Sequence, residues 1–137
     1  MNFVSIRLVT DDVPRLVAFY EEVTGTAARW ATEVFAEIVT PSGVVAVAGR
    51  ATMAPLDGAV PVEPVPGAGP TVIVEFLVAD VDAEHERLGA TVEAVSGPTT
   101  MPWGNRSLLL RDPEGNLVNL FTPVSEAAVA KYRGVPV

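Results

Sequence analysis

The sequence lacks cysteine and has a single histidine, His85, among its 137 residues. Without cysteine there is no thiol catalysis, disulfide scaffold, zinc finger or iron–sulfur cluster. One histidine cannot supply the two imidazoles of a two-His-one-carboxylate iron site within one chain. Carboxylates therefore remain the main candidates for any chemistry.

Basic residues and long apolar runs are also scarce. There are 9 Lys and Arg against 17 Asp and Glu, a formal net charge of −8, and no basic stripe that would suit a phosphate backbone. The longest uncharged apolar stretches, such as residues 43–49, are too short to span a membrane, and the first residues do not resemble a signal peptide. We therefore expect a cytoplasmic protein that binds neither nucleic acid nor membranes.

Hydrophobic residues make up 49% of the chain, which is typical of a folded protein rather than a disordered one. In the first half, residues 4–10 are predicted to form a strand. Asp12 is predicted to cap a helix that ends at Gly25, and short strands are expected at 27–31, 34–40 and 44–48. This order is strand, helix and three strands.

The second half repeats the order. A strand is predicted at 71–78, a helix capped by Asp80, and further strands near 91–95, at 105–111 and at 117–122. Overlaying the halves places Asp12 on Asp80 and Leu8 on Phe76. The repeat predicts two βαβββ modules, residues 1–57 and 71–123, joined by a Pro- and Gly-rich linker at 58–70. Residues 124–137 are expected to form a tail that contains a short helix beginning at Ser125.

This repeat resembles the vicinal oxygen chelate superfamily, which includes glyoxalase I, extradiol dioxygenases and bleomycin-resistance binding proteins. The similar stretches are residues 9–20, 76–83 and 102–118, the last containing Asp112-Pro113-Glu114-Gly115-Asn116. The resemblance implies an α+β fold in which two curved mixed sheets surround a cleft, with the helices outside. It also implies a homodimer.

Strand alternation then assigns the side chains to two faces. The residues expected to pack under the helices are Ile6, Leu8, Val74, Phe76 and Val78, and those expected to face the cleft are Ser5, Arg7, Val9, Ile73, Glu75 and Leu77.

The metal enzymes of this superfamily hold an ion at four equivalent positions, which the resemblance carries to Ser5, Val47, Ile73 and Asn119. None of these residues is a strong ligand for a divalent ion, although the Ser5 hydroxyl and the Asn119 amide are weak ones. We therefore predict no metal, no cofactor and no catalytic residue, and leave open whether the chain is an enzyme.

Seven residues are predicted to contact a ligand: Arg7, Glu75, Trp103, Phe35, Glu37, Asn119 and Ser5. Three of them have a structural alternative. Arg7 and Glu75 occupy equivalent positions, and a structural ion pair between them is the favoured interpretation, ahead of ligand contact or base catalysis by Glu75. Trp103 either stacks on a ligand or anchors its loop. His85 is interpreted as a packing residue, and Arg106 and Arg111 as solvated surface groups.

The resulting hypothesis is a metal-independent protein that binds a small amphipathic molecule, such as an antibiotic, and sequesters it. Two alternatives stay open. One is an enzyme of the same fold, a lyase, isomerase or dioxygenase-like protein, with an atypical or absent metal site. The other is a regulatory module whose cleft is filled by its own side chains.

Overall fold

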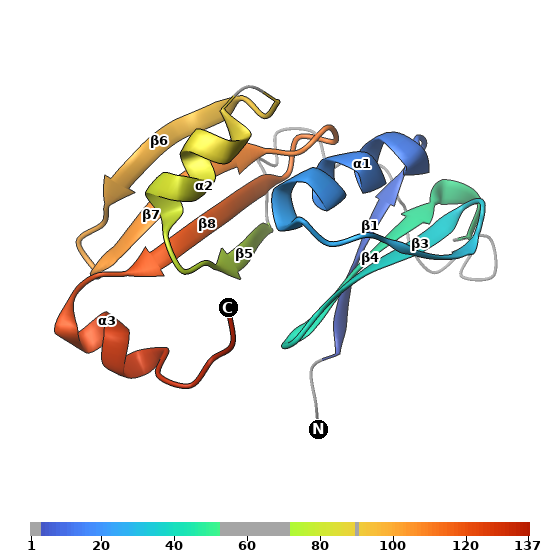
Figure 1. Cartoon of the computed structure of the whole chain (residues 1–137). Helices are drawn as coiled ribbons and strands as arrows, with labels where there is room; N and C mark the ends of the chain where they lie inside the picture. Colours follow the sequence, from blue (N-terminus) through green and yellow to red (C-terminus); the bar gives the residue numbers. More distant parts are fainter. Residues whose placement is uncertain (1–3, 53–71, 90) are drawn as a thin grey trace. The chain divides into compact units, whose positions relative to one another are not determined.

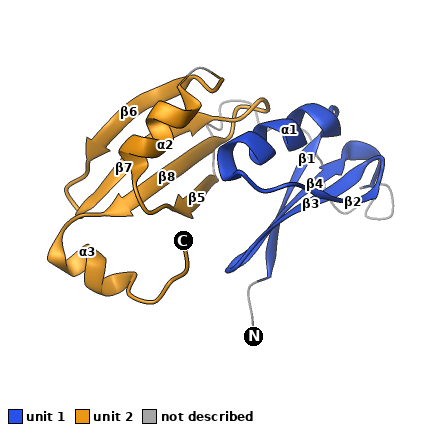
Figure 2. Cartoon of the chain, viewed as in Figure 1, with its two compact units in different colours: residues 1–69 blue, residues 70–137 orange. Residues whose placement is uncertain are grey.

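The computed structural model describes residues 4–52, 72–89 and 91–137. The chain divides into two compact units, residues 1–69 and 70–137, each built around a four-stranded sheet (Figures 1 and 2). We describe each unit by itself. The predicted linker, residues 58–70, lies outside the described residues.

Unit 1 has the predicted order of strand, helix and three strands. Its elements are β1 (Ser5–Thr10), α1 (Val13–Thr24), β2 (Arg29–Thr32), β3 (Phe35–Thr40) and β4 (Gly43–Gly49). The sheet order is β1-β4-β3-β2, with β1 parallel to β4 and the other pairs antiparallel. The Asp12 side chain accepts a hydrogen bond from the Arg15 amide, and Gly25 ends the helix with a φ of 63°, as predicted.

Unit 2 repeats this topology. Its elements are β5 (Ile73–Leu77), α2 (Val81–Leu88), β6 (Ala94–Thr100), β7 (Asn105–Arg111), β8 (Leu117–Pro123) and α3 (Glu126–Lys131). The sheet order is β5-β8-β7-β6, again with one parallel pair, β5 and β8. The two βαβββ modules and the α+β fold are therefore confirmed.

Each unit has its core between the sheet and its first helix. In unit 1, Leu16, Val17 and Tyr20 of α1 are buried, and so are Leu8 and Ile38 of the sheet. The amphipathic spacing of α1 thus places one face on the sheet.

In unit 2 the core lies between α2 and the sheet. The buried residues there are Val81 and Leu88 of α2 with Val74, Leu108, Leu110, Val118 and Leu120 of the strands. The Thr122 hydroxyl accepts a hydrogen bond of 2.9 Å from the Val81 amide, so even-numbered residues of β8 face α2.

The strand predicted near residues 91–95 was placed too early. The observed strand, β6, runs from Ala94 to Thr100 and contains Gly97 and Pro98, which the sequence pattern reads as strand breakers. Its register with β7 shifts twice, between Ala94 and Ser96 and between Ser96 and Thr99. An edge strand with such irregularities tolerates proline, because one side of it makes no ladder hydrogen bonds.

The short C-terminal helix begins at Ser125 as predicted, and it packs on unit 2 rather than extending as a free tail. The Ser125 hydroxyl accepts a hydrogen bond from the Ala128 amide. The amides of Val124 and Ser125 both donate to the Gly104 carbonyl, and Ala128 is buried. This helix is therefore fixed at the turn between β6 and β7.

Candidate functional site

Four of the predicted ligand residues share one face of the unit 1 sheet. We call the side of each sheet that points away from its first helix the open face. A Cβ added to Gly49 would lie 3.5 Å from the Val13 side chain of α1, so odd-numbered β4 residues face α1 and even-numbered ones face the open side. In register, Ala46 pairs with Arg7 and Glu37, and Ala48 pairs with Phe35. Ser5 lies on this face too, opposite Val44.

Arg7 and Phe35 meet across the intervening strand. The Arg7 guanidinium carbon lies 5.4 Å from the centroid of the Phe35 ring, within the range of a cation–π contact. Ala46 and Ala48 lie beneath them and are small, so the long arginine side chain can cross β4 to reach β3. The predicted Arg7–Glu75 ion pair would join the two units and stays a prediction.

Glu75 and Asn119 are partners on the open face of unit 2. They are opposite each other in the parallel ladder of β5 and β8, and the Asn119 Nδ2 donates a hydrogen bond of 2.8 Å to the Glu75 Oε1. Glu75 is exposed, whereas Asn119 is only 9% exposed. The amide therefore holds the carboxylate in place, and within the described residues the other acceptor positions of Glu75 are open to a ligand.

Three buried polar atoms in the described part of the chain have no hydrogen-bond partner, and all three belong to this open face. They are the Oδ1 of Asn105, the Oγ of Ser107 and the Oδ1 of Asn119. The ladder pairs Asn105 with Pro123, Ser107 with Phe121 and Leu109 with Asn119, which places all of these side chains on the face away from α2. A buried polar atom without a partner costs about 1–3 kcal/mol, so this arrangement needs an explanation.

These groups form a diagonal line across three strands, from Glu75 on β5 through Asn119 on β8 to Ser107 and Asn105 on β7. We call these four residues the polar row. Ser107 and Asn105 are two residues apart on one strand, a separation of about 7 Å. Ser107 and Asn119 are diagonal neighbours, also roughly 7–8 Å apart. The row is therefore an extended set of hydrogen-bonding groups rather than a compact cage.

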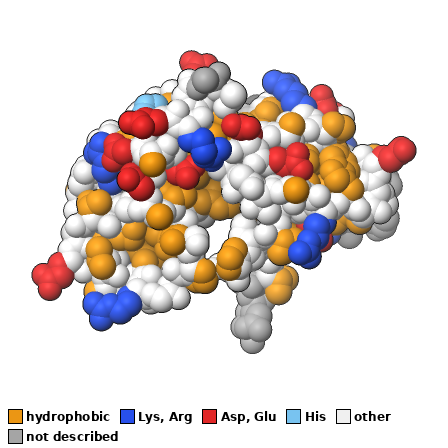
Figure 3. Space-filling model, viewed as in Figure 1, with side chains coloured by type: hydrophobic (Ala, Val, Ile, Leu, Met, Phe, Trp, Pro, Cys, Tyr) orange, Lys and Arg blue, Asp and Glu red, His pale blue; other side chains and the backbone are white. Residues whose placement is uncertain are grey.

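An aromatic pair lies over the same part of the sheet. Phe121, the register partner of Ser107, is buried, and its ring centroid lies 5.1 Å from that of Tyr132 in the C-terminal segment. On the side of unit 2 that carries α2, charged side chains gather over that helix (Figure 3). The open face of unit 2 thus combines acceptor groups with an aromatic wall.

Trp103 lies apart from the polar row, in the turn between β6 and β7. It is 66% exposed, so the indole does not anchor its loop by burial within the part of the chain that the structure describes. This exposure agrees better with the ligand or partner contact predicted for it than with the anchoring alternative.

A model of the Glyoxalase/Bleomycin resistance protein/Dioxygenase superfamily matches residues 2–120. The chain belongs to this superfamily. No protein of curated function matches the sequence.

Solved structures of the superfamily share the fold. A family member from Nocardioides is 25% identical, with a TM-score of 0.75 over 92% of this chain and 85% of that one. A family enzyme from Burkholderia phytofirmans PsJN is 18% identical, with a TM-score of 0.78 over 90% of this chain and 100% of that one. A lactoylglutathione lyase from Agrobacterium tumefaciens is 21% identical, with a TM-score of 0.68 over 88% of this chain and 92% of that one.

The residues at the positions that the resemblance assigns to the metal do not fit a divalent ion. Ser5 and Ile73 occupy the first-strand positions. For the last strand of unit 1, Val47 was the wrong choice, because its pairing with Leu8 and Ala36 places it on the α1 face. Ala46 is the open-face residue there, and Asn119 is its equivalent in unit 2. A methyl group, an aliphatic side chain, a hydroxyl and one amide make no metal site.

Within the described residues, no group of three or more His, Cys, Asp or Glu side chains could hold a metal elsewhere. The described helices also include none that is long and apolar enough to cross a bilayer.

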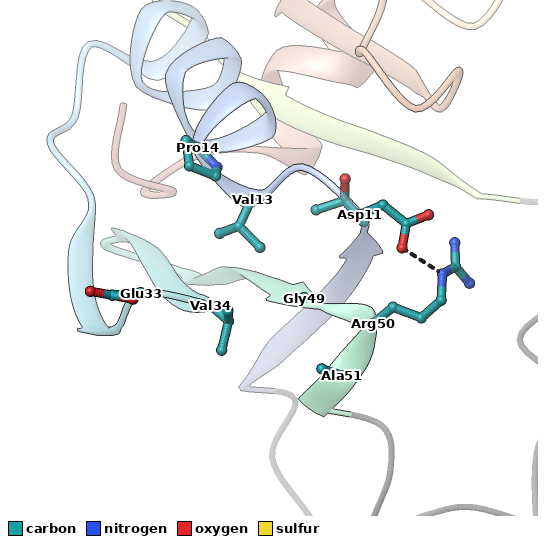
Figure 4. A pocket seen from close by; sticks show the side chains of 9 residues that line it. Asp11, Val13, Pro14, Glu33, Val34, Gly49, Arg50 and Ala51 are labelled. Atoms are coloured by element: carbon teal, nitrogen blue, oxygen red, sulfur yellow. Dashed lines mark hydrogen bonds and ion pairs between the residues drawn. The ribbon is translucent and has the colours of Figure 1, made fainter.

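One pocket lies on the α1 side of the unit 1 sheet and not on its open face. It has a volume of about 270 Å³ at the start of α1, and none of the predicted ligand residues lines it. Asp11 and Arg50 form an ion pair of 2.9 Å beside it, as Figure 4 shows. Its lining is Thr10, Asp11, Val13, Pro14, Glu33, Val34, Gly49, Arg50 and Ala51.

Arg106, interpreted from the sequence as a solvated surface group, instead ties α2 to β7. Its Nε and Nη2 donate hydrogen bonds of 2.6 Å and 2.7 Å to the two carboxylate oxygens of Asp82. This bidentate bond holds the pKa of Asp82 below its usual value, and the carboxylate raises the pKa of Arg106. Both groups lie on the α2 side, so this pair belongs to the packing of the helix and not to the polar row.

Sequence reasoning missed Asn105, Ser107 and Tyr132. Asn105 and Ser107 alternate with Arg106 and Leu108 along β7, and this alternation could have assigned them to the open face. The alternation could not predict that Asn105 and Ser107 are buried and lack partners among the described residues, because burial depends on the segments that cover them. Tyr132 comes to Phe121 only through the path of the C-terminal segment.

Proposed function

We propose that this protein binds a small organic molecule without a metal ion, on the open faces of its sheets. The observation that carries the proposal is the polar row of unit 2, where Asn119 positions the Glu75 carboxylate and three buried polar atoms have no partner among the described residues. Such atoms are satisfied when a ligand supplies complementary groups. The aromatic contact between Phe121 and Tyr132 adds an apolar wall for the rest of the ligand.

The residues at the family's metal positions support binding rather than metal-dependent chemistry. Lewis-acid catalysis needs a held ion, and Ser5, Ala46, Ile73 and Asn119 do not provide the ligands for one. A fold shared with a lactoylglutathione lyase carries no activity across, because function depends on the site. Sequestration of an antibiotic or another amphipathic molecule is the biological role that we propose.

The partners that we propose are one small-molecule ligand for each binding site and a second copy of the chain. Exposed apolar side chains such as Trp103, Trp30 and Ile73 are available for contact with a ligand or with that copy. We propose the cytoplasm as its location.

Titration with a broad panel of amphipathic ligands, followed by calorimetry and Trp fluorescence, tests this function. We expect saturable binding that a chelator does not change. The absence of saturable binding over the whole panel would contradict the proposal. A stoichiometric divalent ion in protein purified without chelator, with a ligand-converting activity that is lost on chelation, would favour the enzyme alternative.

A further inference from the structure

We infer that the ligand of unit 2 is an organic cation that carries at least two separated N–H donors, such as a diamine or polyamine-like molecule. This inference rests on the proposed function and names the class of ligand that the polar row selects. Three properties of the polar row support it: the hydrogen-bonding groups that lack partners, the charge of Glu75, and the distances between the groups.

The row offers acceptors. The Asn119 Nδ2 donates one hydrogen bond to Glu75, and the buried Asn119 Oδ1 is an acceptor that has no partner among the described residues. The Asn105 Oδ1 is a second acceptor, and the Ser107 Oγ accepts as well as donates. The Glu75 carboxylate, when ionised, accepts hydrogen bonds and donates none. A ligand rich in donors fits this set, whereas a carboxylate or a phosphate would meet lone pairs and a negative charge.

The charge of the row favours a cation. Glu75 is the one ionisable side chain of the four, and its partner Asn119 is neutral, so the row carries a net negative charge when the carboxylate is ionised. A hydrogen bond between an ammonium group and a carboxylate is stronger than a neutral one. We therefore place the cationic nitrogen at Glu75 and a second donor at Ser107 or Asn105.

The spacing of the row favours an extended ligand over a metal ion. Neighbouring members on β7 and β8 are roughly 7 Å apart along or across the sheet. A calcium or magnesium ion needs all its oxygen ligands within about 2.6 Å, so one ion cannot satisfy Asn119, Ser107 and Asn105 together. A flexible chain with donors at both ends can do so.

The aromatic pair gives the ligand's carbon chain a surface. Phe121 lies on the open face, two residues after Asn119 on β8 and opposite Ser107 of β7. Leu77 and Leu109 lie on the same face. Tyr132 packs on Phe121, and the five residues after Tyr132 are exposed. Because Tyr132 belongs to no strand, its displacement by a ligand would break no ladder hydrogen bond of the sheet.

The test is a calorimetric titration with α,ω-diamines of increasing length, each compared with the diol and the dicarboxylate of the same length. We expect saturable binding of diamines near one preferred length, and much weaker binding of both analogues. In the NMR spectrum of the protein, the side-chain amide signals of Asn119 and Asn105 should shift on addition of the diamine.

Two charge-neutralising variants make the test specific to the row. Glu75→Gln keeps the shape of the side chain and should weaken diamine binding about tenfold to a hundredfold, the range for hydrogen bonds to charged groups. Glu93→Gln removes the same charge from an exposed position of unit 2 outside the row and should leave the affinity unchanged. Thermal unfolding of both variants establishes that they fold.

Equal binding of diols, tighter binding of dicarboxylates, equal effects of the two variants, or saturation by Mg²⁺ or Ca²⁺ alone would overturn this inference. A crystal structure in which ordered water binds the three buried atoms, and stays there when a diamine is added, would also overturn it. If every diamine fails while another ligand of the broad panel binds saturably, the ligand class is wrong and the proposed function stands. If nothing in the panel binds, both are wrong.

Discussion

Ser107 and its two neighbours in the polar row are costly in the protein without a ligand. Each has a side-chain atom that is shut off from solvent and has no partner within the described residues. In our proposal the arrangement serves binding, because a ligand supplies the missing hydrogen bonds. The cost and the use of the row can be separated by substitution.

Ser107 is 3% exposed and its Oγ is buried, and Ser107→Ala removes only that one oxygen atom. We expect the free energy of unfolding to rise by about 1 kcal/mol, because a desolvated unpaired group is lost. Ligand affinity should fall in the same variant. Urea denaturation measures the stability, and a loss of about 1 kcal/mol instead would mean that the hydroxyl is satisfied in the free protein.

Gly104 is the residue on which the C-terminal helix depends. Its φ is 91°, and an added Cβ would overlap the Ser125 Oγ and lie 2.6 Å from the Ser125 Cβ. We expect Gly104→Ala to lower the free energy of unfolding by more than about 2 kcal/mol, because both the backbone and the packing of α3 oppose it.

Gly115→Ala is the matched control. Gly115 has a similar φ of 88° but has no atom within 4 Å of the added Cβ, so only the backbone cost of about 1–2 kcal/mol applies. Equal effects of the two substitutions in thermal unfolding would show that the contact with Ser125 contributes nothing.

At the scale of elements, α2 is held by more than its apolar face. The bidentate bond between Asp82 and Arg106 joins the first turn of the helix to β7. The hydrogen bond from Arg106 lowers the pKa of Asp82 in the folded state. The ionised Asp82 therefore stabilises the folded protein at pH values above the ordinary pKa of aspartate. This stabilisation is lost as the pH falls through the lowered value.

Asp82→Asn should therefore be less stable than the parent protein at neutral pH and should lose that difference in acid. The effect is small and decreases with added salt, since both side chains are partly exposed to solvent. Unfolding midpoints measured from neutral to acidic pH give the result. A difference that persists at the acidic end would contradict this account of the pair.

Most elements were predictable because local signals and the repeat agree. Asp12, Asp80 and Ser125 cap helices where the sequence indicated, and residues 105–111 form β7 as expected. The strand at β6 was misplaced because Gly97 and Pro98 are local breakers, while the edge position that tolerates them is set by the tertiary fold.

The site was predictable only in part, for a similar reason. Alternation placed Arg7 and Glu75 on the open faces, and the resemblance pointed to Asn119. Val47 was misplaced by one residue because counting from the turn ignored the register of β4, and a shift of one residue changes the face. The hydrogen bond between Asn119 and Glu75 and the unsatisfied atoms beside it need coordinates.

For the whole molecule, association is the property that follows from the exposed apolar side chains. Trp103 is 66% exposed and Ile73 50% exposed, and a second copy of the chain would cover such groups. We expect a homodimer, with about twice the chain mass of 14.4 kDa, in sedimentation velocity at micromolar concentration. A single species at the monomer mass over the whole concentration range would contradict it.

The measurement that tests the central claim most directly is calorimetric titration of the tightest ligand of the panel, before and after treatment with a chelator, with the metal content determined in parallel. Metal-independent binding predicts one affinity and one stoichiometry in both titrations, with no stoichiometric metal in the protein. Binding that disappears after chelation and returns when a divalent ion is added back would contradict the account.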